Sequence, residues 1–312
     1  MTNSPFGSSN DSIGMRIVRK LHCPFGHRNP DGLSQRDRVS RLFVLTAATL
    51  LVVYVGLLLA LWRYQERVVF QPPRRPGLGD VSARRASYHA PDGVALHAYV
   101  IGDCALDNTC LLVFHGNAEV ARWLIPWAAR VHADTGSCVV LAEYRGYDGL
   151  AGVPSYESSA HDARAALAYV RDALNVEPSR IVYFGHSLGT AIAAELAAEM
   201  PPRALVLQSP FSSAREMAKR LILPGLGAFW GAISRVHFDT VARVGSLSCP
   251  VFVAHGDRDL IIPVRMGRAV FDAAREPGEL LIVRGAGHND VPEVGGAEYR
   301  AWFGRALRAG AS

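Results

Sequence analysis

Residues 180–200 of this chain read RIVYFGHSLGTAIAAELAAEM, and this stretch decides the fold. Its first five residues are mostly β-branched or aromatic, which predicts a buried strand. Its alanine-rich second half predicts a helix that ends at the proline pair 201–202. Between the two lies Gly185-His186-Ser187-Leu188-Gly189, a G-x-S-x-G pattern. The two glycines permit a sharp turn, which would expose the Ser187 hydroxyl at the carboxyl end of a sheet.

A serine hydroxyl becomes a good nucleophile only when a base takes its proton. In this type of turn, an acid and then a histidine follow the serine along the chain. Residues 250–254 predict a strand that leads to Asp257 and Asp259, and residues 279–283 predict a last strand that leads to His288. Open α/β sheets place their sites at such strand ends. We therefore expect His288 to be the general base and a carboxylate to orient it.

Two aspartates compete for the role of the acid. Asp257 directly follows Gly256, so it is expected to shape the turn through hydrogen bonds to the backbone. Asp259 is favoured as the partner of His288. Asp290 lies two residues after His288 and is expected at most to help orient that loop.

Hydrolysis at a carbonyl also needs donors for the developing oxyanion. A strand predicted at 110–114 leads to Asn117, whose backbone N–H is expected to act together with that of Leu188. Because both donors belong to the backbone, side-chain identity at the two positions is expected to be secondary. Three further histidines flank the site and are expected to hold its loops rather than to act in catalysis: His115, His186 and His255.

These motifs resemble those of the α/β-hydrolase superfamily, from about residue 86 to residue 308. The chain looks most like the membrane-anchored α/β-hydrolase-domain serine hydrolases. That group includes protein depalmitoylases and lipases and shades into prolyl-oligopeptidase-like enzymes. The resemblance supports Asp259 as the acid and implies ester, thioester or amide hydrolysis through an acyl-enzyme. The motifs that carry it are His115-Gly116-Asn117-Ala118, Gly185-His186-Ser187-Leu188-Gly189, His255-Gly256-x-x-Asp259, Gly287-His288-Asn289-Asp290 and Glu143-Tyr144-Arg145-Gly146-Tyr147.

The chain departs from this group at one loop, and the resemblance leaves several functions open. The group usually continues Arg-Gly-Tyr with Gly-x-Ser, whereas Asp148-Gly149-Leu150 follows here, so one loop near the site is expected to differ. An esterase or thioesterase is the favoured function. A serine peptidase or amidase would use the same triad, and a non-catalytic membrane scaffold would keep only the fold.

Residues 42–62 contain no charged residue and no proline, and Arg41 and Arg63 bracket them. A helix over this stretch is about 32 Å long, which is enough to cross the core of a bilayer. A cleaved signal peptide would have a shorter apolar stretch and a small-residue cleavage site. The sequence therefore predicts a single transmembrane helix.

The segments on either side of this stretch are basic and hold the excess positive charge of a chain whose net charge is +5. Residues 1–41 predict a poorly ordered tail, and residues 63–85 predict a stiff juxtamembrane connector. Basic residues beside an apolar span favour anionic lipid headgroups over nucleic acid as partners. Lys and Arg are nearly balanced between the two sides, so the sequence does not decide on which face of the membrane the domain lies. The sequence also does not decide the oligomeric state.

Residues 86–312 predict one catalytic α/β domain. A hairpin around Asp92-Gly93 precedes strands that alternate with helices, which is typical of a mostly parallel sheet with helices on both faces. All candidate catalytic residues lie beyond Phe114, so residues 1–74 are expected to be dispensable for hydrolysis of a soluble ester. The predicted strands are 110–114, 138–142, 180–184, 204–208, 250–254 and 279–283.

The apolar stretch 211–247 predicts no strand and favours a small helical cap. Leu223, Phe229 and Trp230 are expected to line a substrate pocket in this cap.

The cysteines predict no metal site, since their spacing forms no pattern of metal ligands, and no cofactor is expected. Cys104 and Cys110 flank a connection between two strands and are expected either to form a disulfide or to stay unpaired. Cys138 and Cys249 are expected to be small buried residues.

Overall fold

The computed structural model describes residues 34–74, 83–107, 109–221, 230 and 233–310. The chain divides into two compact units, residues 1–54 and 55–312, and the second contains the whole sheet. Leu223 and Phe229, expected to line a substrate pocket, lie outside the described residues.

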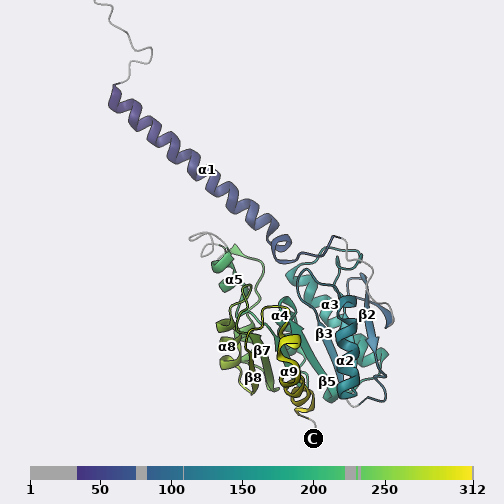
Figure 1. Ribbon diagram of the computed structural model, residues 1–312. Coiled ribbons are helices and arrows are strands. Elements are labelled where there is room, and N and C mark those ends of the chain that lie inside the picture. Colours follow the sequence, from purple (N-terminus) through teal and green to yellow (C-terminus); the bar gives the residue numbers. More distant parts are fainter. Residues whose placement is uncertain (1–33, 75–82, 108, 222–229, 231–232, 311–312) are drawn as a thin grey trace, which may run out of the picture. The chain divides into compact units, whose positions relative to one another are not determined.

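Eight strands form one sheet in the order β1-β2-β4-β3-β5-β6-β7-β8 (Figure 1). β1 and β2 form an antiparallel hairpin and β2 is antiparallel to β4, whereas all other neighbours are parallel. The predicted hairpin and mostly parallel sheet are confirmed, and β3, β4 and β6 have the predicted bounds. The strands are β1 (Arg84–His89), β2 (Ala95–Ile101), β3 (Cys110–Phe114), β4 (Cys138–Ala142), β5 (Ile181–His186), β6 (Ala204–Gln208), β7 (Val251–Gly256) and β8 (Pro277–Val283).

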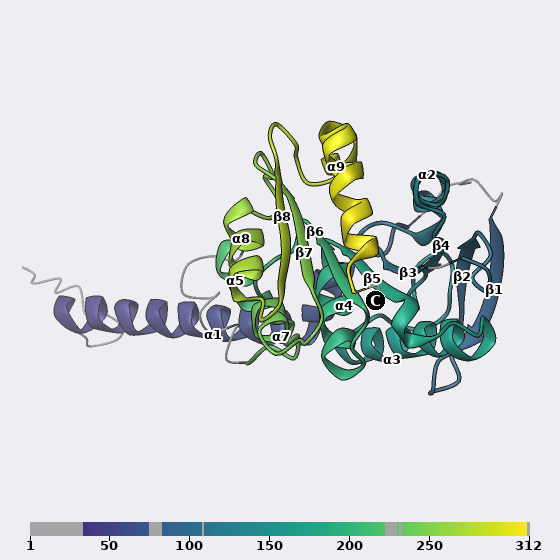
Figure 2. The ribbon, with the colours of Figure 1, turned by 90° about the horizontal axis from the view of Figure 1, so that it is seen from below.

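Helices cover both faces of this sheet (Figure 2). α2 and α9 pack on one face in a core that includes Trp302, and α3, α4, α7 and α8 pack on the other in a core that includes Ile192. Cover on both faces explains why the central strands are nearly continuous apolar runs. The helices are α1 (Gln35–Val69), α2 (Ile125–Thr135), α3 (Tyr156–Ala168), α4 (Leu188–Glu199), α5 (Ala214–Leu221), α7 (Thr240–Val244), α8 (Val264–Ala273) and α9 (Val291–Arg308). Shorter helical turns are η1 (Ala121–Leu124), η2 (Tyr169–Ala173) and η3 (Pro178–Arg180).

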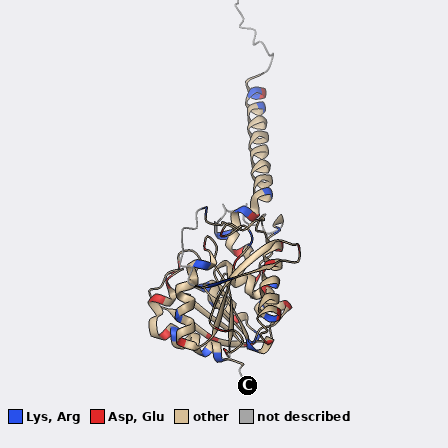
Figure 3. Cartoon of the chain, turned by 90° about the vertical axis from the view of Figure 1, so that its right-hand side faces the viewer, with Lys and Arg blue, Asp and Glu red and all other residues tan. Residues whose placement is uncertain are grey.

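α1 is longer than the predicted transmembrane segment, because it runs from Gln35 to Val69. By length and composition it could cross a membrane. Figure 3 shows Lys and Arg at its two ends and an uncharged stretch between them. Good helix formers continue beyond Trp62, and the helix ends shortly before Pro72 because the residue ahead of a proline disfavours helical backbone. The predicted connector at 63–85 is therefore helical as far as Val69.

The last turns of α1 pack into the second unit. The Gln65 side chain is fully buried, and its Oε1 accepts hydrogen bonds from Ser234 Oγ at 3.1 Å and from the Arg235 N–H at 2.6 Å. Phe70, directly after the helix, is 3% exposed, and its ring centroid lies 6.3 Å from that of Phe238. The expectation that residues 1–74 are dispensable loses its basis, because their removal would uncover these partners.

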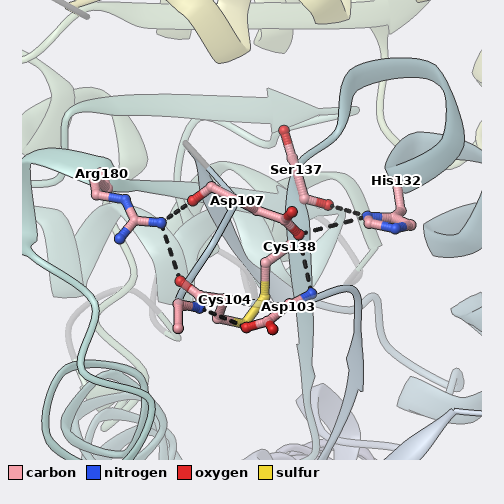
Figure 4. Close-up of a disulfide and its surroundings, with 8 residues drawn as sticks. Asp103, Cys104, Asp107, His132, Ser137, Cys138 and Arg180 are labelled. Carbon is pink, nitrogen blue, oxygen red and sulfur yellow. Dashed lines mark hydrogen bonds and ion pairs between the residues drawn. A yellow bond between two sulfur atoms is a disulfide. The ribbon is translucent and has the colours of Figure 1, made fainter.

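A disulfide joins Cys104 to Cys138 (Figure 4). Of the two alternatives left open, a Cys104–Cys110 disulfide is wrong, and Cys110 is unpaired whereas Cys104 is not. Cys138 is buried as expected, but it is a member of the disulfide. The parallel pairing of β3 with β4 sets Cys138 opposite Cys110 at the starts of the two strands, and all three sulfur atoms lie within 4.8 Å of one another. Arg180 donates a hydrogen bond to the Cys104 carbonyl at 3.0 Å and so fixes the loop that carries this cysteine.

The cap region contains α5 and α7, and no strand lies among the described residues of 211–247, as predicted. Trp230 is 3% exposed. It lines a cavity of about 160 Å³ whose other walls all come from residues 213–239, among them Val236 and Phe238. Trp230 thus lies inside the cap, packed against the segment that also contacts the end of α1.

The buried position of Phe70 predicts that Phe70→Ala destabilises the second unit, residues 55–312, by about 3–5 kcal/mol, the usual cost of deleting a buried aromatic ring. The free energy of unfolding would be measured on the full-length protein in detergent by denaturant titration. Val68→Ala is the matched control: Val68 is 51% exposed, so the change should cost less than about 0.5 kcal/mol. Equal small effects in both variants would contradict the packing of this segment.

Candidate active site

Ser187 lies on the sharp turn between β5 and α4, as the sequence predicts. Its backbone is left-handed, with φ 52° and ψ −115°, and its N–H donates to the Gln208 carbonyl at 3.0 Å. Left-handed backbone strains a residue that has a Cβ, so the surrounding structure must hold the turn in place. A Cβ on Gly185 would lie 2.6 Å from the Thr190 Cα, and one on Gly189 would collide with the Phe114 carbonyl. Both glycines of the pattern are therefore required by close backbone approach.

The structure brings Ser187, His288 and Asp259 into one hydrogen-bonded chain. Ser187 Oγ lies 2.8 Å from His288 Nε2, and His288 Nδ1 lies 2.6 Å from Asp259 Oδ2. With Nδ1 protonated, His288 donates to the carboxylate and accepts from the serine hydroxyl. The three residues follow β5, β7 and β8, whose carboxyl ends share one edge of the sheet.

Asp259 is held in its charged form. Its Oδ1 accepts hydrogen bonds from the backbone N–H groups of Ile261 at 2.8 Å and Ile262 at 2.7 Å. Burial by itself would raise the pKa of the Asp259 carboxyl, but hydrogen bonds from His255 and His288 outweigh it and hold the pKa well below its usual value. A permanently charged carboxylate is what His288 needs in order to keep its Nδ1 proton.

The other two aspartates accept hydrogen bonds from backbone N–H groups, but Asp257 bonds to the neighbouring loop and not to its own turn. Asp257 Oδ1 accepts a hydrogen bond from the Gly285 N–H at 2.7 Å, which ties together the loops after β7 and β8. Asp290 Oδ1 accepts from the Gly287 N–H at 2.6 Å and so closes the turn around His288. Neither of these contacts is to the His288 ring.

His115 holds the loop after β3, as expected. Its Nδ1 lies 2.8 Å from the Gly116 carbonyl and its Nε2 lies 2.7 Å from Glu143 Oε1. Burial lowers the pKa of His115, but the charge and hydrogen bond of Glu143 outweigh it, so the net shift is upward. Glu143 Oε2 also accepts from the Ala121 N–H at 2.9 Å, which fixes the start of η1.

A second ion pair, between Glu119 and His186, joins the loop after β3 to the segment that carries His288. Glu119 Oε2 accepts from the Gly116 N–H at 2.8 Å and lies 3.3 Å from His186 Nδ1. His186 Nε2 lies 3.4 Å from the His288 carbonyl oxygen, to which Ser209 Oγ also donates, at 3.1 Å. The sequence analysis missed Glu119, although its place three residues after a loop glycine is the spacing of a side chain that caps a backbone N–H.

The side chain of Asn117 has a role that the sequence analysis did not expect. Its Nδ2 donates to the Val69 carbonyl at 2.7 Å, and its Oδ1 accepts from the Gln71 N–H at 2.8 Å. Tyr147 Oη donates to the same oxygen at 2.9 Å. The expectation that side-chain identity is secondary here is wrong for Asn117, because its amide joins the end of α1 to the loop after β3.

The loop that departs from the family pattern also has its own contacts. Asp148, where the group has glycine, adopts φ 48°, the left-handed backbone that glycine favours. Its carboxylate pairs with Arg122 and accepts a hydrogen bond from Tyr99 Oη at 3.2 Å. These contacts keep the loop in the conformation that a glycine would adopt freely.

Two groups of side chains in the described part of the chain have metal-ligand chemistry, and neither contacts the triad. The first is Cys104, Cys110 and Cys138, of which two are already joined in the disulfide. The second is His97, Glu143 and Asp148, whose carboxylates already bind His115 and Arg122. Most of their ligand atoms are thus engaged within the protein, although the Cys110 thiol is free.

Comparisons with known proteins agree with this fold. A family model described as serine aminopeptidase, S33, matches residues 107–237. The chain is 34% identical over 255 residues to the uncharacterized protein Rv2307c of Mycobacterium tuberculosis. This alignment covers 79% of this chain and 88% of that protein. It is 32% identical over 166 residues to lysophosphatidylserine lipase ABHD12 of Danio rerio, in an alignment that covers 48% of this chain and 43% of that protein. The structure of Pyrococcus furiosus esterase Pf2001 matches the fold with a TM-score of 0.60 at 20% identity, and covers 76% of this chain and 98% of its own.

The Glu119–His186 pair predicts a change in stability with pH. Burial would raise the pKa of Glu119, but the hydrogen bond and charge of His186 lower it to about 2, from an ordinary value of 4.5. A lowered pKa means that Glu119 contributes stability above about pH 4.5 and loses that contribution as the pH falls towards 2. Thermal unfolding of the wild type and Glu119→Gln should therefore differ most near pH 6, and the difference should shrink as the pH falls through 4.5 towards 2. A difference that stays constant over this range would contradict the ion pair.

Proposed function

The chain belongs to the α/β-hydrolase superfamily, and we propose that it is a membrane-anchored serine hydrolase that cleaves a carboxylic ester or thioester in a lipid or acylated substrate. The observation that carries the proposal is the hydrogen-bonded chain of Ser187, His288 and Asp259. A serine bonded to a histidine that a buried carboxylate orients is the arrangement of an activated nucleophile. This chemistry needs no cofactor.

In the proposed reaction, Ser187 Oγ attacks the substrate carbonyl carbon while His288 Nε2 takes the hydroxyl proton. Asp259 stabilises the imidazolium that forms. The tetrahedral oxyanion accepts hydrogen bonds from the backbone N–H groups of Asn117 and Leu188, the latter at the free amino end of α4. His288 then returns the proton to the leaving alcohol or thiol, which leaves an acyl-enzyme. Water activated by His288 hydrolyses the acyl-enzyme and restores Ser187.

A lipid or acylated substrate is supported by the apolar character of the chain around the site. Leu260 is 86% exposed and Ile261 is 52% exposed, and both directly follow Asp259. Exposed apolar residues beside a catalytic group favour contact with acyl chains or with a membrane surface. α1 is proposed to anchor the chain, with its basic flanks against anionic headgroups.

Peptide or amide hydrolysis is the second candidate, because the matching family model is described as a serine aminopeptidase. The triad serves both chemistries, so the acyl and leaving groups that the pocket accepts decide between them. A non-catalytic scaffold is less well supported, because the strained Ser187 turn is the costly feature that a scaffold would not need.

The proposal predicts that a fluorophosphonate probe labels the wild type but not Ser187→Ala. The same substitution should lower kcat on the order of 10⁶-fold, since the nucleophile is lost. Rates would be compared across p-nitrophenyl esters of rising chain length, a thioester with the same acyl group, and a peptide amide. Preference for the amide would establish the peptidase. If the probe does not label the wild type, the non-catalytic scaffold becomes the favoured function. Activity of Ser187→Ala above a few per cent of the wild type would exclude Ser187 as the nucleophile.

A pair of substitutions separates the two aspartates. Asp259→Asn should lower kcat on the order of 10⁴-fold, because an amide favours the wrong His288 tautomer. Asp257→Asn should cost far less, since this side chain bonds only to the Gly285 N–H in the adjoining loop. Steady-state kinetics of the two purified proteins, with thermal unfolding as a check on folding, provide the measurement. The opposite ranking would transfer the acid role to Asp257.

A further inference from the structure

The end of α1 is joined by one side chain to the loop after β3, which carries Asn117 and which we call the oxyanion loop. The Asn117 amide donates to the last carbonyl of α1, at Val69, and accepts from the N–H of Gln71, just past the helix. We call these two hydrogen bonds the Asn117 clamp. They connect residues far apart in the sequence, and they use both polar atoms of the amide.

The residues on either side of Asn117 leave it few other constraints. Gly116 is held through its N–H by Glu119, and a Cβ at Gly116 would lie 2.9 Å from His186 Nδ1. Ala118 has left-handed backbone with φ 54°. Asn117 therefore lies between a residue packed against the His186 ring and a strained residue. Its side chain is held by the Asn117 clamp and by Tyr147 Oη, which donates to the same Oδ1 at 2.9 Å. Because these bonds restrain the Cα–Cβ direction of Asn117, they also restrain the adjoining peptide plane that carries its backbone N–H.

The segment that holds Asn117 is itself held by the cap. Gln65 Oε1 accepts from Ser234 and Arg235, and the Arg235 guanidinium lies 5.0 Å from the centre of the Trp62 ring. Phe70 packs beside Phe238. Cap, helix end and oxyanion loop thus form one connected structure within residues 55–312.

We infer that residues 65–71 are a positioning element of the active site, which sets the Asn117 N–H towards the oxyanion through the Asn117 clamp. The inference rests on the proposed function, because it assigns a role in oxyanion stabilisation. Such a donor must be held within about 0.5 Å of its productive position, and losing one costs about 10²–10³ in kcat. Releasing the clamp leaves the N–H present but loosely aimed, so kcat falls about 10- to 100-fold. KM changes little, because the bond forms fully only in the transition state.

Two substitutions break the clamp from opposite sides. Asn117→Ala removes the amide but keeps the backbone N–H. Gln71→Pro removes the N–H that donates to Asn117, and Gln71→Ala is its matched control because alanine keeps that N–H. Each is made in the full-length protein in detergent and tested on a short water-soluble p-nitrophenyl ester. We expect Asn117→Ala and Gln71→Pro each to lower kcat about 10- to 100-fold at nearly constant KM, and Gln71→Pro to lose at least tenfold more kcat than Gln71→Ala.

The double variant Asn117→Ala with Gln71→Pro decides whether the two act through one contact. Its kcat should equal that of the single variant with the lower kcat, since residues in one contact have non-additive effects. Losses that multiply, a change confined to KM, or unchanged kcat would overturn the inference. So would losses that track a lowered unfolding temperature, the mark of a purely structural contact. An inactive wild type would instead refute the proposed function, which keeps the two failures distinct.

Discussion

The close approach of α4 to the end of β3 is the constraint on which the rest of the site depends. Gly189 lies so near the Phe114 carbonyl that any side chain would collide with it. This approach lets the chain reverse at Ser187 and sets the amino end of α4 beside the loop after β3. The two expected oxyanion donors, on Leu188 and Asn117, are neighbours for that reason. Without the approach, the serine turn would relax and the donors would separate.

Charge then ties the loops around this turn into one network. His115 with Glu143 is a buried pair and His186 with Glu119 is a partly buried one, and both hold backbone groups of the loop after β3. The second pair continues through His186 to the carbonyl of His288. Removing one partner of such a pair would leave a buried group uncompensated. The pairs therefore keep the oxyanion loop and the base in a fixed mutual arrangement.

Much of this site could be predicted because it depends on local pattern and strand order. The strands at 110–114, 138–142 and 204–208 were identified from apolar runs, and Ser187, Asp259 and His288 from their places after strands. The missed features depend on contacts between distant segments. Cys138 meets Cys104 only because β3 and β4 are parallel neighbours. The Asn117 contact with Val69 and Gln71 leaves no periodic signal, since an amide bonds as readily to water as to a helix end.

The burial of Gln65 and Phe70 has a consequence for how the enzyme would meet its substrate. A flexible tether of n residues lets a domain range over about 5–6 Å × √n. Here the last turns of α1 belong to the core of the catalytic unit, so the proposed membrane segment ends where the domain begins. Because no long flexible tether would separate the two, the Ser187 hydroxyl would range over a shorter distance from the bilayer than it would on such a tether. Depth in the membrane, as well as the shape of the acyl group, would become a criterion by which substrates are chosen.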